Sequence, residues 1–149
     1  MSNIRAIDLF CGTGGLSLGL QQAGIEVVAG IDLEHRCKYP YEHNLKAQFI
    51  EASVVDVTAE TLNELWGKGV LRLLAGCAPC QPFSSQRRGK DPSQDKNWRL
   101  LDEFGRLVCE THPEYVTMEN VPLLARNAVF ERFVQTLEEE GYSVDYGVM

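Results

Sequence analysis

The sequence has no long apolar run and none of the marks of a secreted protein. No stretch of its 149 residues approaches the roughly 20 apolar residues of a membrane-spanning helix. The N-terminus, MSNIRAIDLF, lacks the basic patch, apolar stretch and cleavage site of a secretory signal. The five cysteines are an odd number at irregular spacing, whereas a secreted disulfide framework usually has an even count. We therefore expect a protein of the reducing cytoplasm that does not cross a membrane.

The chain is also poor in positive charge. It has 14 Lys and Arg against 21 Asp and Glu, which gives a formal net charge of −7. A surface that binds double-stranded DNA needs Lys and Arg to replace phosphate counterions. This chain therefore holds DNA poorly, unless its few bases are concentrated in one place or another segment supplies them. Its 44% hydrophobic and 23% charged content are typical of one soluble globular domain.

Short apolar runs alternate with segments of helical periodicity along the whole chain. The runs predict strands over 4–10, 26–33, 70–75 and 115–118, a strand and its exit over 49–57, and the start of a sixth strand over 142–149. The periodic segments predict helices over 14–23, 34–44, 59–66, 99–111 and 129–140, with an interruption of the second near Pro40 and with Thr58 as the cap of the third. Such alternation predicts an α/β fold with a mostly parallel sheet and helices on both faces. Ligands of these folds bind at the carboxyl ends of the strands.

A glycine-rich turn, DLFCGTGG (Asp8–Gly15), lies between the first strand and the first helix. Glycines permit a tight turn and close approach to a ligand, and the following helix presents free N–H groups. The spacing fits neither the dinucleotide fingerprint nor a P-loop. Asp32, which ends the second strand, suits a ribose hydroxyl, and Asp56 after the third strand suits an exocyclic amine. Together they favour a site for an adenosine-bearing ligand over a turn with no ligand.

A second candidate element, GCAPCQPFSS (Gly76–Ser85), follows the fourth strand and opens a long loop that runs to Asn97. A cysteine placed there can be a nucleophile if cationic neighbours or a helix N-terminus lower its pKa. The one strongly basic cluster of the chain, between positions 87 and 90, lies just downstream.

Two other interpretations compete for this element, since Cys77 and Cys80 form a C-x-x-C pair. A zinc site needs two more ligands, but the other cysteines are scattered and the histidines show no paired spacing. A thioredoxin-like redox pair is expected at a helix start, whereas Cys80 is followed by Gln-Pro-Phe and a long loop. The nucleophile is favoured, a redox pair is the lesser alternative, and no metal is expected.

An acid ends the fifth strand in YVTMENVP (Tyr115–Pro122). A carboxylate at this place is expected to be partly desolvated, which raises its pKa toward a value useful in proton transfer. Since the fourth and fifth strands should be close, Glu119 and Cys80 are expected to face one pocket. The alternative is that Glu119 only caps the next turn.

A nucleophilic cysteine, an acid and an adenosine site describe methyl transfer from S-adenosylmethionine to an unreactive ring carbon such as cytosine C5. With DLFCGTGG, APCQPFSS (Ala78–Ser85) and MENV (Met118–Val121) in this order, the sequence resembles the DNA (cytosine-5)-methyltransferase family of restriction-modification systems. The resemblance implies a Rossmann-like S-adenosylmethionine-dependent methyltransferase fold, truncated here before its last strands.

The resemblance also implies roles for named residues. Cys80 is the nucleophile, Glu119 contacts N3 and the amino group of a flipped cytosine, and Asn120 braces the cysteine loop. The residues lining the S-adenosylmethionine pocket are Asp8, Phe10, Gly12, Thr13, Gly14, Asp32, Leu33, Asp56, Val57 and Leu100. The residues facing double-stranded DNA, in a mobile loop over 81–90, are Gln81, Ser84, Ser85, Arg87 and Arg88.

The sequence departs from the family pattern in two ways. Cys77 and Ala78 stand where the family has a second glycine and a second proline. The family's arginine-rich motif, target-recognition domain and returning C-terminal segment have no counterpart in residues 1–149. We therefore expect the N-terminal part of a catalytic domain, weak or inactive alone, which meets DNA through the complete enzyme. The alternatives are the cofactor-binding subunit of a split methyltransferase with a complementing C-terminal subunit, a tRNA cytosine-5 methyltransferase, and a thiol oxidoreductase.

Overall fold

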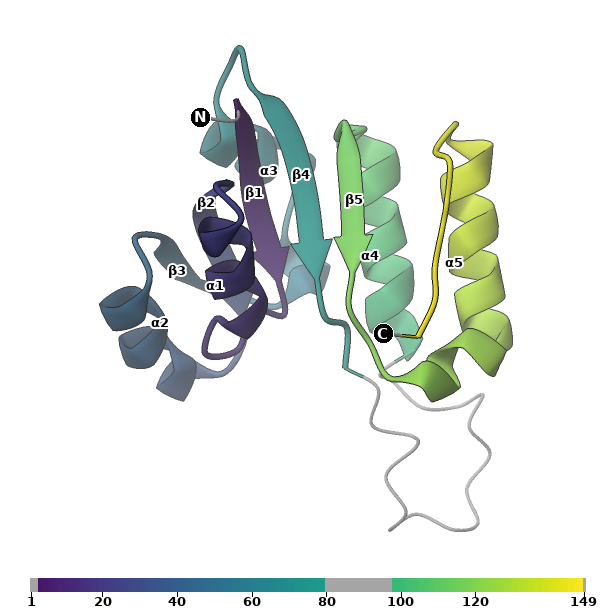
Figure 1. Cartoon of the computed structure of the whole chain (residues 1–149), viewed down its shortest axis with the longest axis horizontal. Helices are drawn as coiled ribbons and strands as arrows, with labels where there is room; N and C mark the ends of the chain where they lie inside the picture. The colour runs from purple at the N-terminus through teal and green to yellow at the C-terminus, as the bar shows by residue number, and fades with distance from the viewer. Residues whose placement is uncertain (1–2, 80–97, 149) are drawn as a thin grey trace, which may run out of the picture.

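The computed structural model describes residues 3–79 and 98–148, and these form one twisted sheet covered by helices (Figure 1). The described strands are all parallel and lie in the order β3-β2-β1-β4-β5. Their bounds are β1 (Ile4–Leu9), β2 (Glu26–Asp32), β3 (Gln48–Glu51), β4 (Leu71–Gly76) and β5 (Tyr115–Met118). The predicted α/β class and parallel sheet are confirmed.

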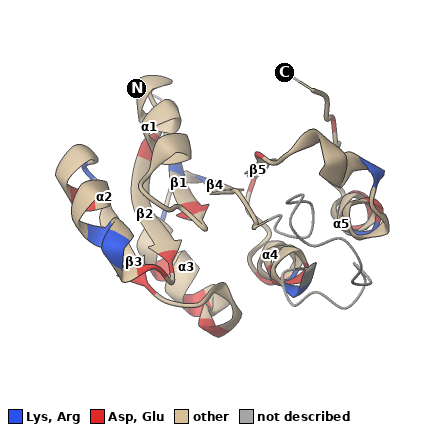
Figure 2. Ribbon diagram, turned by 90° about the horizontal axis from the view of Figure 1, so that it is seen from below, with Lys and Arg blue, Asp and Glu red and all other residues tan. Residues whose placement is uncertain are grey.

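Helices cover both faces of this sheet (Figure 2). The α-helices are α1 (Gly15–Gln22), α2 (Lys38–Asn44), α3 (Ala59–Trp66), α4 (Trp98–Thr111) and α5 (Ala128–Glu139). In the part of the chain that the structure describes, three 3₁₀ turns join them: η1 (His35–Cys37), η2 (Val54–Asp56) and η5 (Pro122–Arg126). Seen along the strands, α1 and α2 lie on one face, whereas α3 and α4 lie on the other with α5 beside α4. Within the described ranges, no helix is long and apolar enough to cross a membrane.

The strands are buried on both faces because successive side chains point to opposite sides. Ile7, which is fully buried, joins the larger core beneath α3 and α4, together with Trp66 and Phe104. Its neighbour Ala6 joins a smaller cluster on the α1 side with Val27 and other strand residues. The near-continuous apolar runs of the sequence follow from this two-sided burial.

Two local details refine the sequence predictions. In the segment over 49–57 the strand ends at Glu51, and the exit from it is η2, which starts where Ser53 accepts a hydrogen bond from the Val55 amide. The second helical segment is interrupted near Pro40, as predicted. The break lies between η1 and α2, and Pro40 occupies the first turn of α2, where its missing N–H costs no helical hydrogen bond.

The predicted sixth strand is absent from residues 142–148, and this prediction was wrong for the described part of the segment. These residues run alongside α5 without pairing to a described strand (Figure 1). The Tyr142 hydroxyl donates to the Pro113 carbonyl at 2.5 Å, and the Tyr146 ring meets Phe130 of α5 edge to face at 5.0 Å. Side-chain packing on α5 therefore takes the place of a strand ladder.

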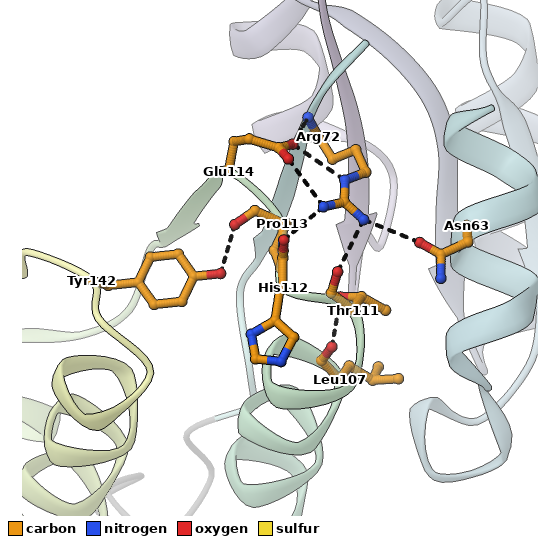
Figure 3. Close-up of polar contacts among 8 residues, drawn as sticks. All are labelled: Asn63, Arg72, Leu107, Thr111, His112, Pro113, Glu114 and Tyr142. Carbon is orange, nitrogen blue, oxygen red and sulfur yellow. Dashed lines mark hydrogen bonds and ion pairs between the residues drawn. The ribbon is translucent and has the colours of Figure 1, made fainter. Parts of the chain in front are cut away.

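Arg72 fastens the connection between α4 and β5 at the amino end of the sheet (Figure 3). Its guanidinium donates to the carbonyls of Thr111 at 2.9 Å and His112 at 2.7 Å, and to Asn63 Oδ1 at 3.3 Å. It also donates to both carboxylate oxygens of Glu114, and these hydrogen bonds lower the pKa of Glu114 to about 2. One side chain thus satisfies the end of α4 and fixes the start of β5 against β4.

We expect Arg72→Gln to lower the free energy of unfolding by about 2 kcal/mol, since two carbonyls and a carboxylate lose charged donors. Urea denaturation measures the loss. Because the pKa of Glu114 is low in the folded state, the difference from the wild type should be full above pH 4.5 and shrink as the pH falls toward 2.

Arg132→Gln is the matched control for this prediction. Arg132 donates three hydrogen bonds to Asp102, but the two side chains are 56% and 51% exposed, and such pairs contribute less than about 1 kcal/mol. Equal losses of unfolding free energy in Arg72→Gln and Arg132→Gln would contradict the conclusion that Arg72 stabilises the fold more than a surface ion pair does.

Candidate active site

The carboxyl ends of the five strands meet at one edge of the sheet (Figure 1). The segments that leave this edge carry the residues singled out in the sequence. They are the glycine turn after β1, residues 33–34 after β2, 52–57 after β3, 77–79 after β4 and 119–121 after β5. The topology therefore brings the glycine turn, the segment 77–79 at the start of the second motif, and the residues that follow β5 to one side of the molecule.

The glycine turn after β1 has an unusual backbone. Phe10, Gly12 and Gly14 have φ values of 57°, 52° and 97°, in the left-handed region that favours glycine. A Cβ atom on Gly14 would collide with Leu45 Cδ1 and lie 3.0 Å from the Tyr41 ring, whereas one on Gly12 would have no atom within 4 Å. Gly14 is thus required by packing, and Gly12 leaves open space that a ligand can approach.

Asp32 ties this turn to the end of β2. Its Oδ2 accepts a hydrogen bond from the Gly12 amide and its Oδ1 accepts one from the Glu34 amide, both at 2.8 Å. The Cys11 amide donates to the Ile31 carbonyl at 3.2 Å and holds the same two segments together. Since each carboxylate oxygen can accept two hydrogen bonds, Asp32 keeps acceptor capacity for a ligand hydroxyl.

Apolar and acidic groups flank Asp32 along this edge. Leu33 follows it directly and is 70% exposed, which is unusual for a leucine beside a buried sheet. In η2 Asp56 is exposed, whereas Val57 behind it is buried. Thr13 is exposed in the glycine turn, and Leu100 is half-buried in the first turn of α4. The edge therefore carries two carboxylates, Asp32 and Asp56, and the exposed side chain of Leu33.

Asp8 lies beneath the glycine turn and is fully buried. The Ser17 hydroxyl donates to Asp8 Oδ2 at 2.6 Å and lies 2.9 Å from the Tyr41 hydroxyl. Asp8 Oδ1 has no hydrogen-bond partner among the residues that the structure describes. Burial raises the pKa of Asp8 to about 6, although the bond from Ser17 opposes the shift. Asp8 thus supports the turn from below.

The end of β5 is fastened to the segment that follows β4. The Glu119 amide donates to the Gly76 carbonyl at 3.1 Å, and the Cys77 thiol donates to Glu119 Oε2 at 3.2 Å. The Asn120 side chain donates to the Ala78 carbonyl at 2.8 Å, two residues before Cys80. Glu119 is exposed rather than partly desolvated as expected, because β5 is the outermost of the described strands.

Several predicted site residues lie outside the described residues. They are the nucleophile Cys80 and the DNA-facing residues Gln81, Ser84, Ser85, Arg87 and Arg88. Their roles stay predictions. Among residues 3–79 and 98–148, no group of three or more His, Cys, Asp or Glu side chains could hold a metal ion.

Sequence reasoning missed three features of this edge. Ser17 and Tyr41 support the glycine turn through contacts between elements far apart in the chain, and no local spacing signals them. The sequence does not signal that the Cys77 thiol donates a hydrogen bond to Glu119. A third feature is Arg106 of α4, which contacts the segment around Asp56.

The comparisons with known proteins agree with this arrangement. A family model described as C-5 cytosine-specific DNA methylase matches residues 4–149. The chain belongs to this family. The family likeness implied by DLFCGTGG, APCQPFSS and MENV is therefore confirmed.

Several curated members of the C-5 cytosine-specific DNA methylase family are similar to the chain. Type II methylase M.HgiDII of Herpetosiphon aurantiacus is 45% identical over 146 residues, which cover 96% of this chain and 41% of the relative. Type II methyltransferase M.XorII of Xanthomonas oryzae pv. oryzae is 35% identical and covers 100% of this chain and 37% of the relative. Type II methyltransferase M.HgiGI of H. aurantiacus is 34% identical over 79% of this chain and 90% of its own length. The chain thus spans about two-fifths of the first two relatives.

Solved methyltransferase structures share the fold. A prophage-encoded protein of E. coli, named as a DNA modification methyltransferase, has a TM-score of 0.74 at 26% identity, over 91% of this chain and 38% of that one. The Dnmt2 methyltransferase of S. pombe has a TM-score of 0.69 at 22% identity, over 91% of this chain and 40% of that one. The predicted Rossmann-like methyltransferase fold is confirmed.

The buried Asp8 generates a prediction about stability and pH. Because its pKa rises from 3.8 to about 6 on folding, the folded state binds the proton more tightly. The contribution of Asp8 to the free energy of unfolding should therefore fall by roughly 3 kcal/mol between about pH 4 and pH 6. Asp8→Asn cannot titrate, so its stability relative to the wild type should rise across this window, as measured by urea denaturation.

Asp102→Asn serves as the control for this pH series, since Asp102 is half-exposed on α4 and far from the glycine turn. Its stability relative to the wild type should stay flat between pH 4 and pH 6. A flat difference for Asp8→Asn as well would show that Asp8 titrates normally in the folded protein.

Proposed function

We propose that this chain forms the S-adenosylmethionine site and the catalytic region of a DNA (cytosine-5)-methyltransferase of a restriction-modification system. The observation that carries the proposal is the glycine turn held by Asp32, with open space beside Gly12 and an exposed Leu33 next to it. The type II methyltransferase names of relatives at 30% identity or more favour DNA over RNA as the substrate.

The residues of this edge suit S-adenosylmethionine. Asp32 can accept the ribose hydroxyls, the exposed Leu33 side chain can cover the adenine face, and Asp56 can accept the adenine amino group. Phe10 and Leu100, both half-buried, would close the sides of the pocket. When bound, S-adenosylmethionine supplies the methyl group.

The chain's own residues would activate the cytosine. The Cys80 thiolate adds to C6 of the ring and forms an S–C6 bond, and the displaced π electrons make C5 nucleophilic. A protonated Glu119 donates to N3 and stabilises the charge that the addition creates. After C5 has been substituted, its proton leaves to a base and the S–C6 electrons return to sulfur. The ring face is unreachable inside a duplex, so the cytosine must be flipped out.

Two structural contacts support this assignment of roles. Asn120 holds the carbonyl of Ala78, so the end of β5 anchors the segment that leads to Cys80. The Glu119 carboxylate lies at the exit of β5, where an incoming base can reach it. Since the net charge is −7, we infer that the bases around Arg87 and Arg88 provide this chain's main contact with DNA phosphates.

We expect the chain to bind S-adenosylhomocysteine, the product cofactor, in a saturable calorimetric titration. Asp32→Ala removes both the ribose acceptor and the support of Gly12, and should weaken binding by at least about a hundredfold. Glu34→Gln removes the same charge two residues away, where the side chain faces Arg36, and should leave the affinity within about threefold. A folded wild-type chain that does not bind would overturn the proposed cofactor site.

DNA containing 5-fluorocytosine tests the nucleophile, because fluorine at C5 cannot leave as a proton and the S–C6 bond persists. With S-adenosylmethionine present, the wild type and Cys77→Ser should form a covalent adduct, whereas Cys80→Ser should not. Trapping accumulates even slow turnover, and denaturing electrophoresis detects it. An adduct in Cys80→Ser would reject Cys80, and its loss in Cys77→Ser alone would favour Cys77.

A further inference from the structure

Arg106, on α4, reaches across to the segment that carries Asp56. Its Nη2 donates to the Val57 carbonyl at 3.0 Å and to the Val54 carbonyl at 3.4 Å. These two carbonyls lie on either side of Asp56 in the chain. A single guanidinium nitrogen therefore bridges the ends of η2.

Two acids on α4 fix the orientation of this guanidinium. Arg106 Nε donates to Glu103 Oε2 at 2.6 Å, and Nη1 donates to Glu110 Oε2 at 2.9 Å. Burial alone would lower the pKa of Arg106, but the bonds to both acids outweigh it and raise the pKa. The Arg106 side chain is 31% exposed and is held on three sides, so Nη2 has little freedom to leave the η2 carbonyls.

The backbone of the Asp56 segment forms its own short turn. The Asp56 amide donates to the Ser53 carbonyl at 2.9 Å, and the Val57 amide donates to the Val54 carbonyl at 3.3 Å, a long hydrogen bond. The Val54 and Val57 side chains are buried in the core, whereas Asp56 is exposed. The two hydrogen bonds from Arg106 tie this turn to α4 and so fix where it holds the Asp56 carboxylate.

We propose that Arg106 is a positioning residue for adenine recognition: by holding the carbonyls of Val54 and Val57, it sets the Asp56 carboxylate where the adenine amino group can donate to it. The inference rests on the proposed cofactor site. It adds that α4, through Arg106, controls which nucleobase of the cofactor this site accepts. Leu100, which would line the proposed pocket, lies in the first turn of the same helix. Leu100 and Arg106 are therefore held by one rigid element.

Hypoxanthine gives a sharp probe of this role. It differs from adenine at C6, where a carbonyl oxygen replaces the amino group, and at N1, which carries a hydrogen. At the place of the amino group it therefore presents an acceptor to the Asp56 carboxylate. A site built around a hydrogen bond rejects such an analogue strongly, since two acceptors then face each other. The preference for the adenine ligand over the hypoxanthine ligand therefore reports where Asp56 lies, whereas overall affinity also reports general damage.

The experiment compares S-adenosylhomocysteine with S-inosylhomocysteine by calorimetry on the full chain. We expect the wild type to prefer the adenine ligand by roughly a hundredfold. Arg106→Gln should weaken the adenine ligand by about tenfold or more and the hypoxanthine ligand by less than about twofold, so the preference collapses. Arg106→Lys keeps the charge and one donor, and should keep an intermediate preference.

Two further variants separate positioning from structure. Arg132→Gln removes an arginine of α5 that pairs with α4, and should change neither affinity. Asp56→Asn should lose the preference by itself, and adding Arg106→Gln to it should leave the ligand ratio unchanged, because Arg106 acts through Asp56. Thermal unfolding of each variant shows that it is folded at the titration temperature.

The outcomes are distinct. Equal weakening of both ligands in Arg106→Gln, or an unchanged preference, would overturn the positioning role while leaving the proposed function intact. Absence of S-adenosylhomocysteine binding by the folded wild type would overturn the proposed cofactor site and this inference together.

Discussion

The hydrogen bond between the Asp32 carboxylate and the Gly12 amide is the contact on which the rest of the site depends. At 2.8 Å it joins the turn after β1 to the end of β2, and the second oxygen of Asp32 holds the chain as it leaves β2. A turn with three residues at positive φ has no regular ladder to support it. The Asp32 carboxylate supplies the hydrogen bond that a strand ladder would otherwise provide, and space beside Gly12 stays open for a ligand.

Two carboxylates serve this turn in different surroundings. Asp32 accepts hydrogen bonds from two backbone amides at the half-exposed edge. Asp8 is fully buried, and burial raises its pKa to about 6, so its proton is held more tightly. Ser17 and Tyr41 compensate part of this burial. The Asp32 carboxylate therefore lies at the surface where a ligand can reach it, and Asp8 supports the turn from the interior.

The sequence predicted those parts of the fold that depend on local patterns. The helix over 59–66 and the strand over 115–118 agree with the structure residue for residue, and Thr58 accepts the Thr61 amide as the predicted cap. The parallel topology then brought the described parts of the three motifs to one edge. The tail over 142–148 was mispredicted because an apolar run is equally compatible with packing on a helix, and the contact between Tyr142 and Pro113 has no local signature.

The site was predictable where chemistry lies in motifs and unpredictable where it lies between elements. Asp32 and Asp56 follow strands and could be found by counting, but the contact from Arg106 to η2 spans 49 residues of sequence. In the sequence Arg106 reads as one charge of an amphipathic helix, with acids three residues before it and four after it. Ion pairs with those acids on the solvent-exposed face of the helix would be enough to explain the presence of Arg106. Only the packing of α4 against η2 shows that the same acids aim its remaining nitrogen at the carbonyls beside Asp56.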